Sequence, residues 1–198
     1  KDGVILGATI VQYLLERSRV IAPGPNERSY HIFYQFIAGA SEQERDLYQL
    51  GKFEDFPCLV GGDCTLVETI DDVEDYRNTR AAMDIMGLTS EEQSNVFAVL
   101  AAILHLNRLT FIDDDDDQAS LENRDPLLIA ARLLNVSADL LEKVLVSKKL
   151  VIMNNAIIKK LNSEGAVDAR DALMKALYVN LFNWLIDKIN EKISAHQT

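Results

Sequence analysis

The amino-acid sequence predicts a mainly α-helical fold, with one or two strands and a short β-ribbon near residues 148–162. Three observations support this prediction. Helix-capping patterns recur along the chain, most apolar segments repeat with a helical period, and few segments have the residue types of strands. The chain has 198 residues, of which 48% are hydrophobic, so it can bury a large core without disulfides or a structural metal.

The first predicted element is a strand over residues 4–21, VILGATIVQYLLERSRVI. The segment is rich in Val, Ile, Thr, Tyr and Leu, and it carries no charged side chain before Glu16. Such a run is typical of a strand buried on both faces, although the pattern alone does not exclude a helix. A buried strand needs neighbouring strands, and few other segments here resemble one. The sequence therefore indicates that the chain is part of a larger structure.

The next predicted elements are two helices separated by a glycine. The turn APGPNE at 22–27 leads into a helix over RSYHIFYQFIAGA, which we expect to stop near Gly39. Ser41 is followed three residues later by Glu44, which is the capping-box pattern at the start of EQERDLYQL. Residues 51–66 contain Pro57 and three glycines, and they are predicted to be irregular.

Two longer helices are predicted in the middle of the chain. The first covers DDVEDYRNTRAAMDIMG, with acidic residues in its first turn and Gly87 as its C-cap. The second covers TSEEQSNVFAVLAAILHLNRL and is capped by Thr89 or Ser90. Its apolar stretch VFAVLAAILHL is too short to span a bilayer, and we expect it to be a core helix.

The last third of the sequence alternates loops and helices. The acidic run DDDDDQASLEN at 113–123 is predicted to be an exposed loop, because neighbouring carboxylates repel. Two short helices follow, RDPLLIAARLLN and SADLLEKVLVS, with Pro126 in the first turn of the earlier one. The final helix is expected from about Val167 to Ser194, roughly 40 Å long, with leucines at four-residue steps and most of one side buried.

The ribbon prediction rests on KKLVIMNNAIIKKL, where two apolar runs flank a pair of asparagines. Lys148, Lys149, Lys159 and Lys160 bracket these runs in a chain whose net charge is -11. One interpretation is an ordinary hairpin whose charged edges prevent strand pairing with other chains. The other is an interaction loop with an apolar tip and a basic rim that suits an acidic partner. The pattern alone leaves both open.

The sequence gives no positive signal for catalysis or metal binding. The net charge of -11 disfavours a general nucleic-acid or anionic-membrane binder. Cys58 and Cys64 lack the CxxC spacing and are predicted to be reduced, partly buried thiols. The acidic run fails as an EF-hand, because Gln118 and Arg124 stand where Gly and a bidentate Glu are needed.

Phosphate and histidine chemistry are equally unsupported. The Gly51–Lys52 pair lacks the first glycine of a P-loop, because Asp46 stands there, and no GxGxxG occurs. His31 and His105 lie in apolar helices and are predicted to be core or boundary residues. We therefore assign no catalytic, cofactor-binding or metal-binding residue in this chain.

Four segments together resemble the motor domain of myosin. They are GATIVQYLLERSRV, NERSYHIFYQFIAGA, YRNTRAAMDIMGLTSEEQSNVFAVLAAILHLNRLTF and ARDALMKALYVNLFNWLIDKIN, in the family's order and spacing. The resemblance spans nearly the whole chain. It implies that residues 1–198 form one region, a mainly α-helical part of a P-loop-type motor matching most of the upper fifty-kilodalton subdomain. The first strand would then belong to that motor's larger central sheet.

The resemblance also implies where the chemistry lies. Myosin motors hydrolyse ATP with a P-loop and two switch segments, and we expect these to flank this chain. The intact motor would be an actin-activated ATPase that needs ATP and Mg, whereas this chain alone would bind neither and would be inactive. The implied partners are the actin filament and the rest of the motor domain, without nucleic acid or membrane insertion. The implied location is the cytoplasm and its cytoskeleton, within a myosin complex.

Two segments match family surfaces that touch actin. The implied actin-binding residues, in what the family calls the cardiomyopathy loop, are Lys148, Lys149, Ile152, Met153, Asn154, Asn155, Ala156, Ile157, Ile158, Lys159 and Lys160. The second segment is the family's loop four. Its acidic residues here are Asp113, Asp114, Asp115, Asp116 and Asp117, and we expect them to attract an acidic filament little, or to reach a basic patch at its edge.

The chain departs from the family pattern at one notable position. Family members usually have an acidic or phosphorylatable residue sixteen positions before the Asp of DALMKAL, which here is Asp171, so the count reaches Asn155. Asparagine carries no charge and accepts no phosphate, so we expect weaker actin coupling than with an acidic residue. Two alternatives to the motor are a stand-alone helical interaction module and an independent hydrolase. The isolated chain is predicted to be marginally stable, because its first strand would lack a sheet.

Overall fold

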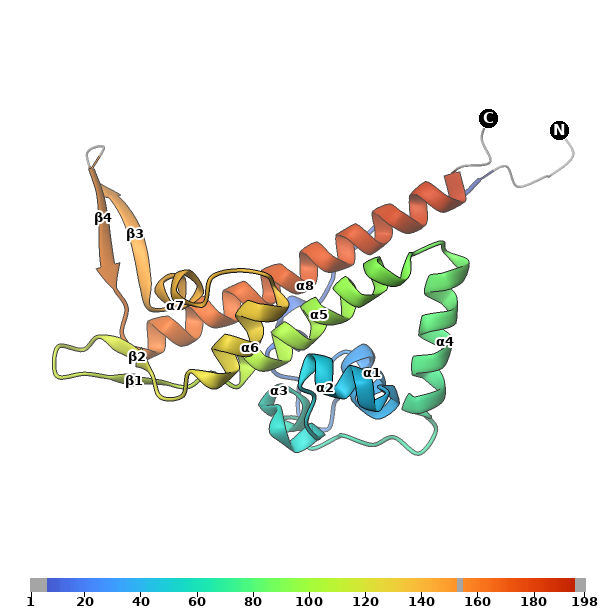
Figure 1. Cartoon of the computed structure of the whole chain (residues 1–198), viewed down its shortest axis with the longest axis horizontal. Helices are drawn as coiled ribbons and strands as arrows, with labels where there is room; N and C mark the ends of the chain where they lie inside the picture. Colours follow the sequence, from blue (N-terminus) through green and yellow to red (C-terminus); the bar gives the residue numbers. More distant parts are fainter. Residues whose placement is uncertain (1–6, 153–154, 195–198) are drawn as a thin grey trace, which may run out of the picture.

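The protein is described by a computed structural model for residues 7–152 and 155–194. Figure 1 shows a mainly helical molecule in which one long helix crosses the whole length of the fold. The α-helices are α1 (His31–Gly39), α2 (Glu42–Tyr48), α3 (Pro57–Val60), α4 (Asp72–Ile85), α5 (Ser90–Asn107), α6 (Asp125–Leu133), α7 (Ala138–Val146) and α8 (Ser163–Ser194). Two short 3-10 helices, η1 (Arg17–Val20) and η2 (Phe53–Asp55), and four strands complete the described elements: β1 (Phe111–Asp113), β2 (Ala119–Leu121), β3 (Ser147–Ile152) and β4 (Asn155–Lys160).

Helices α5 and α8 form an antiparallel pair at the centre of the fold (Figure 1). Near one end, the ammonium of Lys188 in α8 lies 2.8 Å from a carboxylate oxygen of Glu92 in the first turn of α5. Near the other end, Arg170 in α8 donates a hydrogen bond of 2.8 Å to the Leu109 carbonyl just after α5. Polar contacts therefore fix the register of the two helices at both ends.

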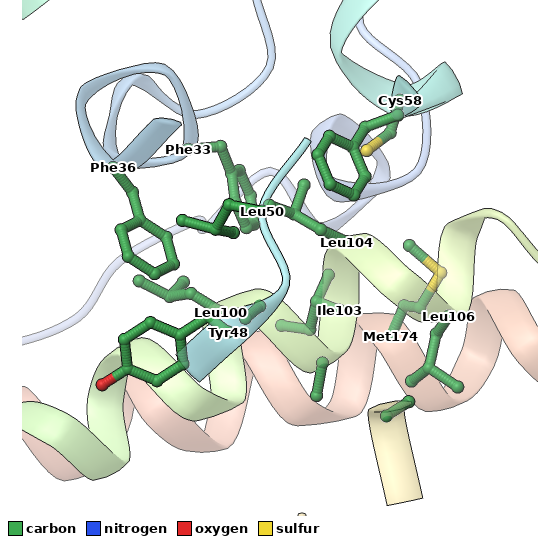
Figure 2. Close-up of a cluster of buried hydrophobic side chains, with 14 of the residues drawn as sticks. Phe33, Phe36, Tyr48, Leu50, Cys58, Leu100, Ile103, Leu104, Leu106 and Met174 are labelled. Atoms are coloured by element: carbon green, nitrogen blue, oxygen red, sulfur yellow. The ribbon is translucent and has the colours of Figure 1, made fainter. Parts of the chain in front are cut away.

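The core surrounds α5, whose second half is mostly apolar and is buried on every side. Residues 100–107 are all buried, and Val96 and Phe97 join them one turn earlier. A helix that is apolar all round is stable in water only when other elements cover it on every side. Helices α1 to α3 cover one side, and α8 and α6 cover others, so Phe33, Cys58 and Met174 all enter the same cluster (Figure 2). This confirms the prediction of a core helix, and no helix within the described residues is long and apolar enough to cross a membrane.

The predicted starts of α2, α4 and α5 are confirmed, whereas α1 begins three residues later than predicted, at His31, and residues 51–66, predicted to be irregular, contain η2 and α3. The Ser41 hydroxyl accepts a hydrogen bond from the Glu44 N–H, and the Glu44 carboxylate accepts one from the Ser41 N–H, which completes the capping box. Thr89 and Glu92 form the same arrangement at the start of α5. Gly87 has φ of +84°, a left-handed conformation that suits glycine just after a helix.

The N-terminal prediction of a doubly buried strand is wrong for the described part of residues 4–21. Residues 7–16 adopt no regular secondary structure, and residues 17–20 form η1. Val11, Tyr13 and Leu14 are at least 80% exposed rather than buried. A strand requires a neighbour for its N–H and C=O groups, and β1 to β4 pair only with one another within residues 7–152 and 155–194. Residues 4–6 lie outside the described residues.

The acidic run is not the simple loop that its composition predicts. β1 and β2 pair antiparallel with Phe111 opposite Leu121, so the run folds into a hairpin whose turn holds residues 114–118. Charge repulsion along the run is offset because the carboxylates of Asp113 and Asp114 accept hydrogen bonds from backbone N–H groups. The predicted ribbon is confirmed as the second hairpin, with Ser147 opposite Lys160 and Ile152 opposite Asn155.

The last helix begins four residues earlier than predicted, at Ser163. The prediction that most of one side is buried is only partly right. Of its described residues, Ala166, Met174 and Tyr178 are buried, whereas Leu177 and Leu181 are packed against the core but remain partly exposed. The single helix therefore presents partly covered apolar side chains on several faces.

Candidate functional site

The β3–β4 hairpin projects from the end of the fold where α8 begins (Figure 1). Lys148 and Lys159 lie directly opposite each other in its register, and both are exposed. Like charges in directly opposed positions weaken a strand pair. Ile157 and Ile158 are consecutive and therefore point to opposite faces, yet they are 50% and 56% exposed. Both faces of the ribbon thus meet solvent in the described part of β4.

The base of this hairpin is held firmly although its body is exposed. The Leu161 N–H donates to the Val146 carbonyl at 2.9 Å, and the Ala119 N–H donates to the Leu161 carbonyl at 2.7 Å. Ala119, Val146 and Ala166 form a small buried cluster at the same place. A lone two-stranded ribbon is marginally stable in water. The anchoring at its base therefore positions the four lysines relative to α7, α8 and the β1–β2 hairpin.

Two of the five predicted aspartates stabilise the local structure. Asp113 accepts hydrogen bonds of 2.6 Å from both the N–H and the hydroxyl of Ser163, the first residue of α8. A carboxylate at this position also interacts favourably with the positive end of the helix dipole. Asp114 accepts hydrogen bonds from the N–H groups of Asp116 and Gln118, and so shapes the hairpin turn. The sequence could not reveal the first contact, because the two residues are 50 positions apart.

The structure brings the two predicted segments to one groove. A hollow of about 610 Å³ lies between the hairpins, with Asp116 and Asp117 on one wall and Lys148, Lys159 and Lys160 on the other. Within the described residues, no lysine of this group lies within 4.0 Å of an aspartate of the acidic turn. The groove therefore presents charges of both signs, and its lysines are accessible to another molecule.

Part of the predicted site lies beyond what the structure describes. Met153 and Asn154 are outside the described residues, and of residues 150–152 and 155–156 only the backbone is described. The backbone of Asn155 begins β4 and pairs with Ile152. The predicted residues whose side chains are described are Lys148, Lys149, Ile157, Ile158, Lys159 and Lys160, and all of these are exposed.

The Gly51–Lys52 turn, the nearest sequence match to a P-loop, is not shaped to hold a phosphate. In the Gly51–Lys52 turn, the Lys52 N–H donates to the Asp55 carboxylate at 2.7 Å. A Cβ added at Gly51 would lie 2.1 Å from that same carboxylate, so an acidic side chain fills the space that a phosphate would need. No group of three His, Cys, Asp or Glu side chains within residues 7–152 and 155–194 is placed to hold a metal ion. We assign no reaction step to these residues.

The titratable side chains considered from the sequence have structural surroundings. His105 is buried, and its Nε2 lies 2.9 Å from the Tyr48 carbonyl oxygen, so this nitrogen carries the proton. Burial lowers the pKa of His105. His31 is exposed at the first residue of α1, so the prediction of a core or boundary position is wrong for it. Cys58 is buried and Cys64 is partly exposed, and both are free thiols, as predicted.

A second exposed region lies at the opposite end of α8. Residues 7–16 pass alongside the C-terminal half of that helix, and Ile10 contacts Asn190. Val11, Tyr13 and Leu14 line a shallow hollow of about 390 Å³ together with Phe182 and Ile186 of α8. The sequence predicts the apolar character of the segment but not its contact with the final helix, because 180 positions separate Ile10 and Asn190.

Comparisons with known proteins give one consistent result. All 198 residues match the family described as myosin head (motor domain). The chain is 39% identical over 201 residues to a myosin-I heavy chain of Dictyostelium discoideum, which covers 100% of this chain and 8% of that protein. It is 40% identical over 201 residues to the human unconventional myosin-XV, covering 100% of this chain and 6% of that protein. It is 42% identical over 195 residues to myosin-7 of Arabidopsis thaliana, covering 96% and 11% respectively. The chain thus spans about a tenth or less of the length of these relatives.

Proposed function

The chain belongs to the myosin head (motor domain) family, and we propose that it is the part of an actin-based, ATP-driven motor that carries actin-binding surface and links it to the motor's central sheet. Residues 1–198 would form one region of the motor domain, matching the upper fifty-kilodalton subdomain. The intact motor would hydrolyse ATP with Mg, using phosphate-binding segments other than the residues described above. The stand-alone interaction module is not favoured, because the match to the motor family covers the whole chain.

The observation that carries the actin-binding role is the exposed lysine hairpin. Its four lysines project from a chain whose net charge is -11. Actin is strongly acidic, so attraction toward this basic projection would orient the motor as it approaches the filament. Ile157 and Ile158, each at least half exposed, offer apolar area that is buried only when a partner covers the ribbon.

The acidic wall of the groove favours a particular orientation. Asp116 and Asp117 lie across the groove from the lysines, so an acidic filament would be attracted to one wall and repelled by the other. At physiological salt the screening length is about 8 Å, so these charges act only over short distances. The role we propose for the acidic turn is therefore to limit how far the filament covers the groove, or to meet a basic patch at its edge.

The link to the central sheet rests on residues 7–16. Ile10, Val11, Tyr13 and Leu14 are exposed, and the backbone of the segment has no strand partner among the described residues. We propose that the sheet which completes this segment is formed with other parts of the intact motor domain. Helix α8 runs between the hairpins and this segment (Figure 1), so it would transmit displacement between the filament and the sheet.

Charge reversal on the hairpin tests the proposal. In the intact motor, Lys148→Glu combined with Lys159→Glu should weaken filament binding in a co-sedimentation assay about tenfold or more at low salt. Each reversal replaces a modest attraction with a similar repulsion, of about 0.2–1 kcal/mol each. Lys192→Glu, an equally exposed lysine at the other end of α8, is the matched control and should leave binding unchanged. Equal filament affinity for the hairpin variant and the control would refute this role for the hairpin.

A further inference from the structure

The side chain of Asn190 binds both backbone groups of one residue near the start of the chain. The Ile10 N–H donates to the Asn190 Oδ1 at 2.7 Å, and the Asn190 Nδ2 donates to the Ile10 carbonyl oxygen at 2.9 Å. The N–H and C=O of one residue point to the same side only where the backbone is extended. A primary amide has one acceptor and two donors side by side, so it meets both groups as an adjacent strand would.

This contact has a consequence for how the N-terminal segment can pair. In an extended chain, residues 10 and 12 direct their backbone groups to one edge, and residues 9 and 11 direct theirs to the other. Asn190 occupies the first edge at Ile10, so a neighbouring strand on that side is stopped there. Among residues 7–152 and 155–194, the backbone groups of residues 9 and 11 have no strand partner, so the second edge is open to a neighbour. The asparagine therefore selects which edge of the segment joins a sheet.

The same helix is fixed in a similar way at its other end. There, Asp113 from the acidic hairpin binds the N–H and the hydroxyl of Ser163. Between Ser163 and Asn190 the helix spans roughly 40 Å, at 1.5 Å per residue. α8 is thus joined by paired hydrogen bonds to the hairpin region at one end and to residues 7–16 at the other.

We propose that Asn190 is a positioning residue that holds residues 7–16 in register with the end of α8, so that movement of the lysine hairpin reaches the sheet segment. This inference rests on the proposed function for its mechanical meaning, but the clamp itself does not depend on it. Removing the amide frees the Ile10 backbone from the helix. It leaves the lysine hairpin, some 40 Å away along α8, unchanged.

Hydrogen exchange on the intact motor tests the clamp. Asn190→Ala removes both hydrogen bonds, and Asn190→Asp keeps the acceptor for the Ile10 N–H but loses the donor to its carbonyl. The exchange rate of the Ile10 amide should rise about tenfold in Asn190→Ala and less in Asn190→Asp, since one hydrogen bond contributes up to about a tenfold effect. Asn180→Ala, an exposed asparagine of α8, is the matched control and should not change this rate. An unchanged rate at Ile10 in Asn190→Ala would overturn the clamp.

Motor assays on the same variants test the coupling. We expect Asn190→Ala to keep filament affinity and the ATPase rate without actin within about twofold of the parent, while actin-activated turnover falls about fivefold or more. A merely structural role would instead lower all three together, and that result would overturn the positioning role. So would an unchanged ratio of activated to basal turnover. If the hairpin reversal described above fails to weaken filament binding while the Ile10 exchange rate still rises, the clamp stands and the proposed actin surface does not.

Discussion

Replacement of Arg28 by methionine should destabilise the fold strongly, because it leaves a buried carboxylate without its partner. Arg28 and Asp72 are both buried, and the guanidinium donates to Asp72 through both of its terminal nitrogens. One of these nitrogens also donates to the Thr65 carbonyl at 2.7 Å. The guanidinium carbon lies 3.9 Å from the ring centroid of Tyr34. These contacts tie the turn before α1 to the start of α4.

The magnitude follows from these contacts. Breaking a buried ion pair by removing one partner costs about 3–5 kcal/mol, mostly because the remaining charge stays desolvated. The lost hydrogen bond to Thr65 adds about 1 kcal/mol. The buried Nε of Arg28 has no hydrogen-bond partner among the described residues, so removing it offsets part of the lost stability. We therefore expect a net loss of about 4 kcal/mol in the free energy of unfolding.

Urea denaturation followed by circular dichroism measures the loss. With a slope of about 2 kcal/mol per molar urea, 4 kcal/mol corresponds to a midpoint lower by about 2 M. The matched control is Arg77→Met, which breaks the exposed pair between Arg77 and Glu74 and should cost less than about 1 kcal/mol. The double variant Arg28→Met/Asp72→Leu should regain much of the stability. Pulse proteolysis of the intact motor gives the same comparison in the whole protein. Equal urea midpoints for Arg28→Met and Arg77→Met would show that the buried pair contributes no more to stability than the exposed pair.

Three further predictions concern single side chains. Burial lowers the pKa of His105, so the unfolded chain binds a proton at this residue more readily than the folded chain does. The free energy of unfolding should therefore keep its full value above pH of about 6.5 and fall as the pH drops below it. His105→Gln should flatten this pH dependence in urea midpoints measured between pH of about 5.5 and 7.5, whereas His31→Gln should not. Burial raises the pKa of the Cys58 thiol to about 12, so iodoacetamide at pH 8 should label Cys64 alone in the native chain and both cysteines in urea, as counted by mass spectrometry. Asn155→Asp should raise the actin-activated ATPase or the apparent actin affinity of the intact motor, and no change in either would remove the idea that this position tunes coupling.

The features that the sequence predicted well are local ones. The capping boxes at Ser41 and Thr89 and the left-handed glycine after α4, Gly87, are set by residues within one or two turns, so pattern alone identifies them. The ribbon at 147–160 was found because its two strands are adjacent in sequence and its charges mark its edges. The candidate lysines are exposed because they lie on that same ribbon.

The features that the sequence did not predict depend on partners far along the chain. Residues 7–16 have strand-like composition, yet a strand forms only where neighbouring backbone groups are available, and the described chain provides none for them. The acidic run gains order through Asp113, which binds Ser163 50 positions away. The Asn190–Ile10 contact spans 180 positions, and asparagine near the end of an amphipathic helix gives no signal of such a role.

Zero-length carbodiimide cross-linking of the intact motor on actin filaments tests the central claim most directly, because it joins only lysines and carboxylates already in contact. Mass spectrometry should find Lys148 or Lys159 joined to acidic residues of actin, and these products should decline as salt is raised. Asp116 and Asp117 across the groove compete with actin's carboxylates for cross-linking to these lysines. Products that join these lysines only to the motor's own acidic turn, with none to actin at any salt concentration, would contradict it.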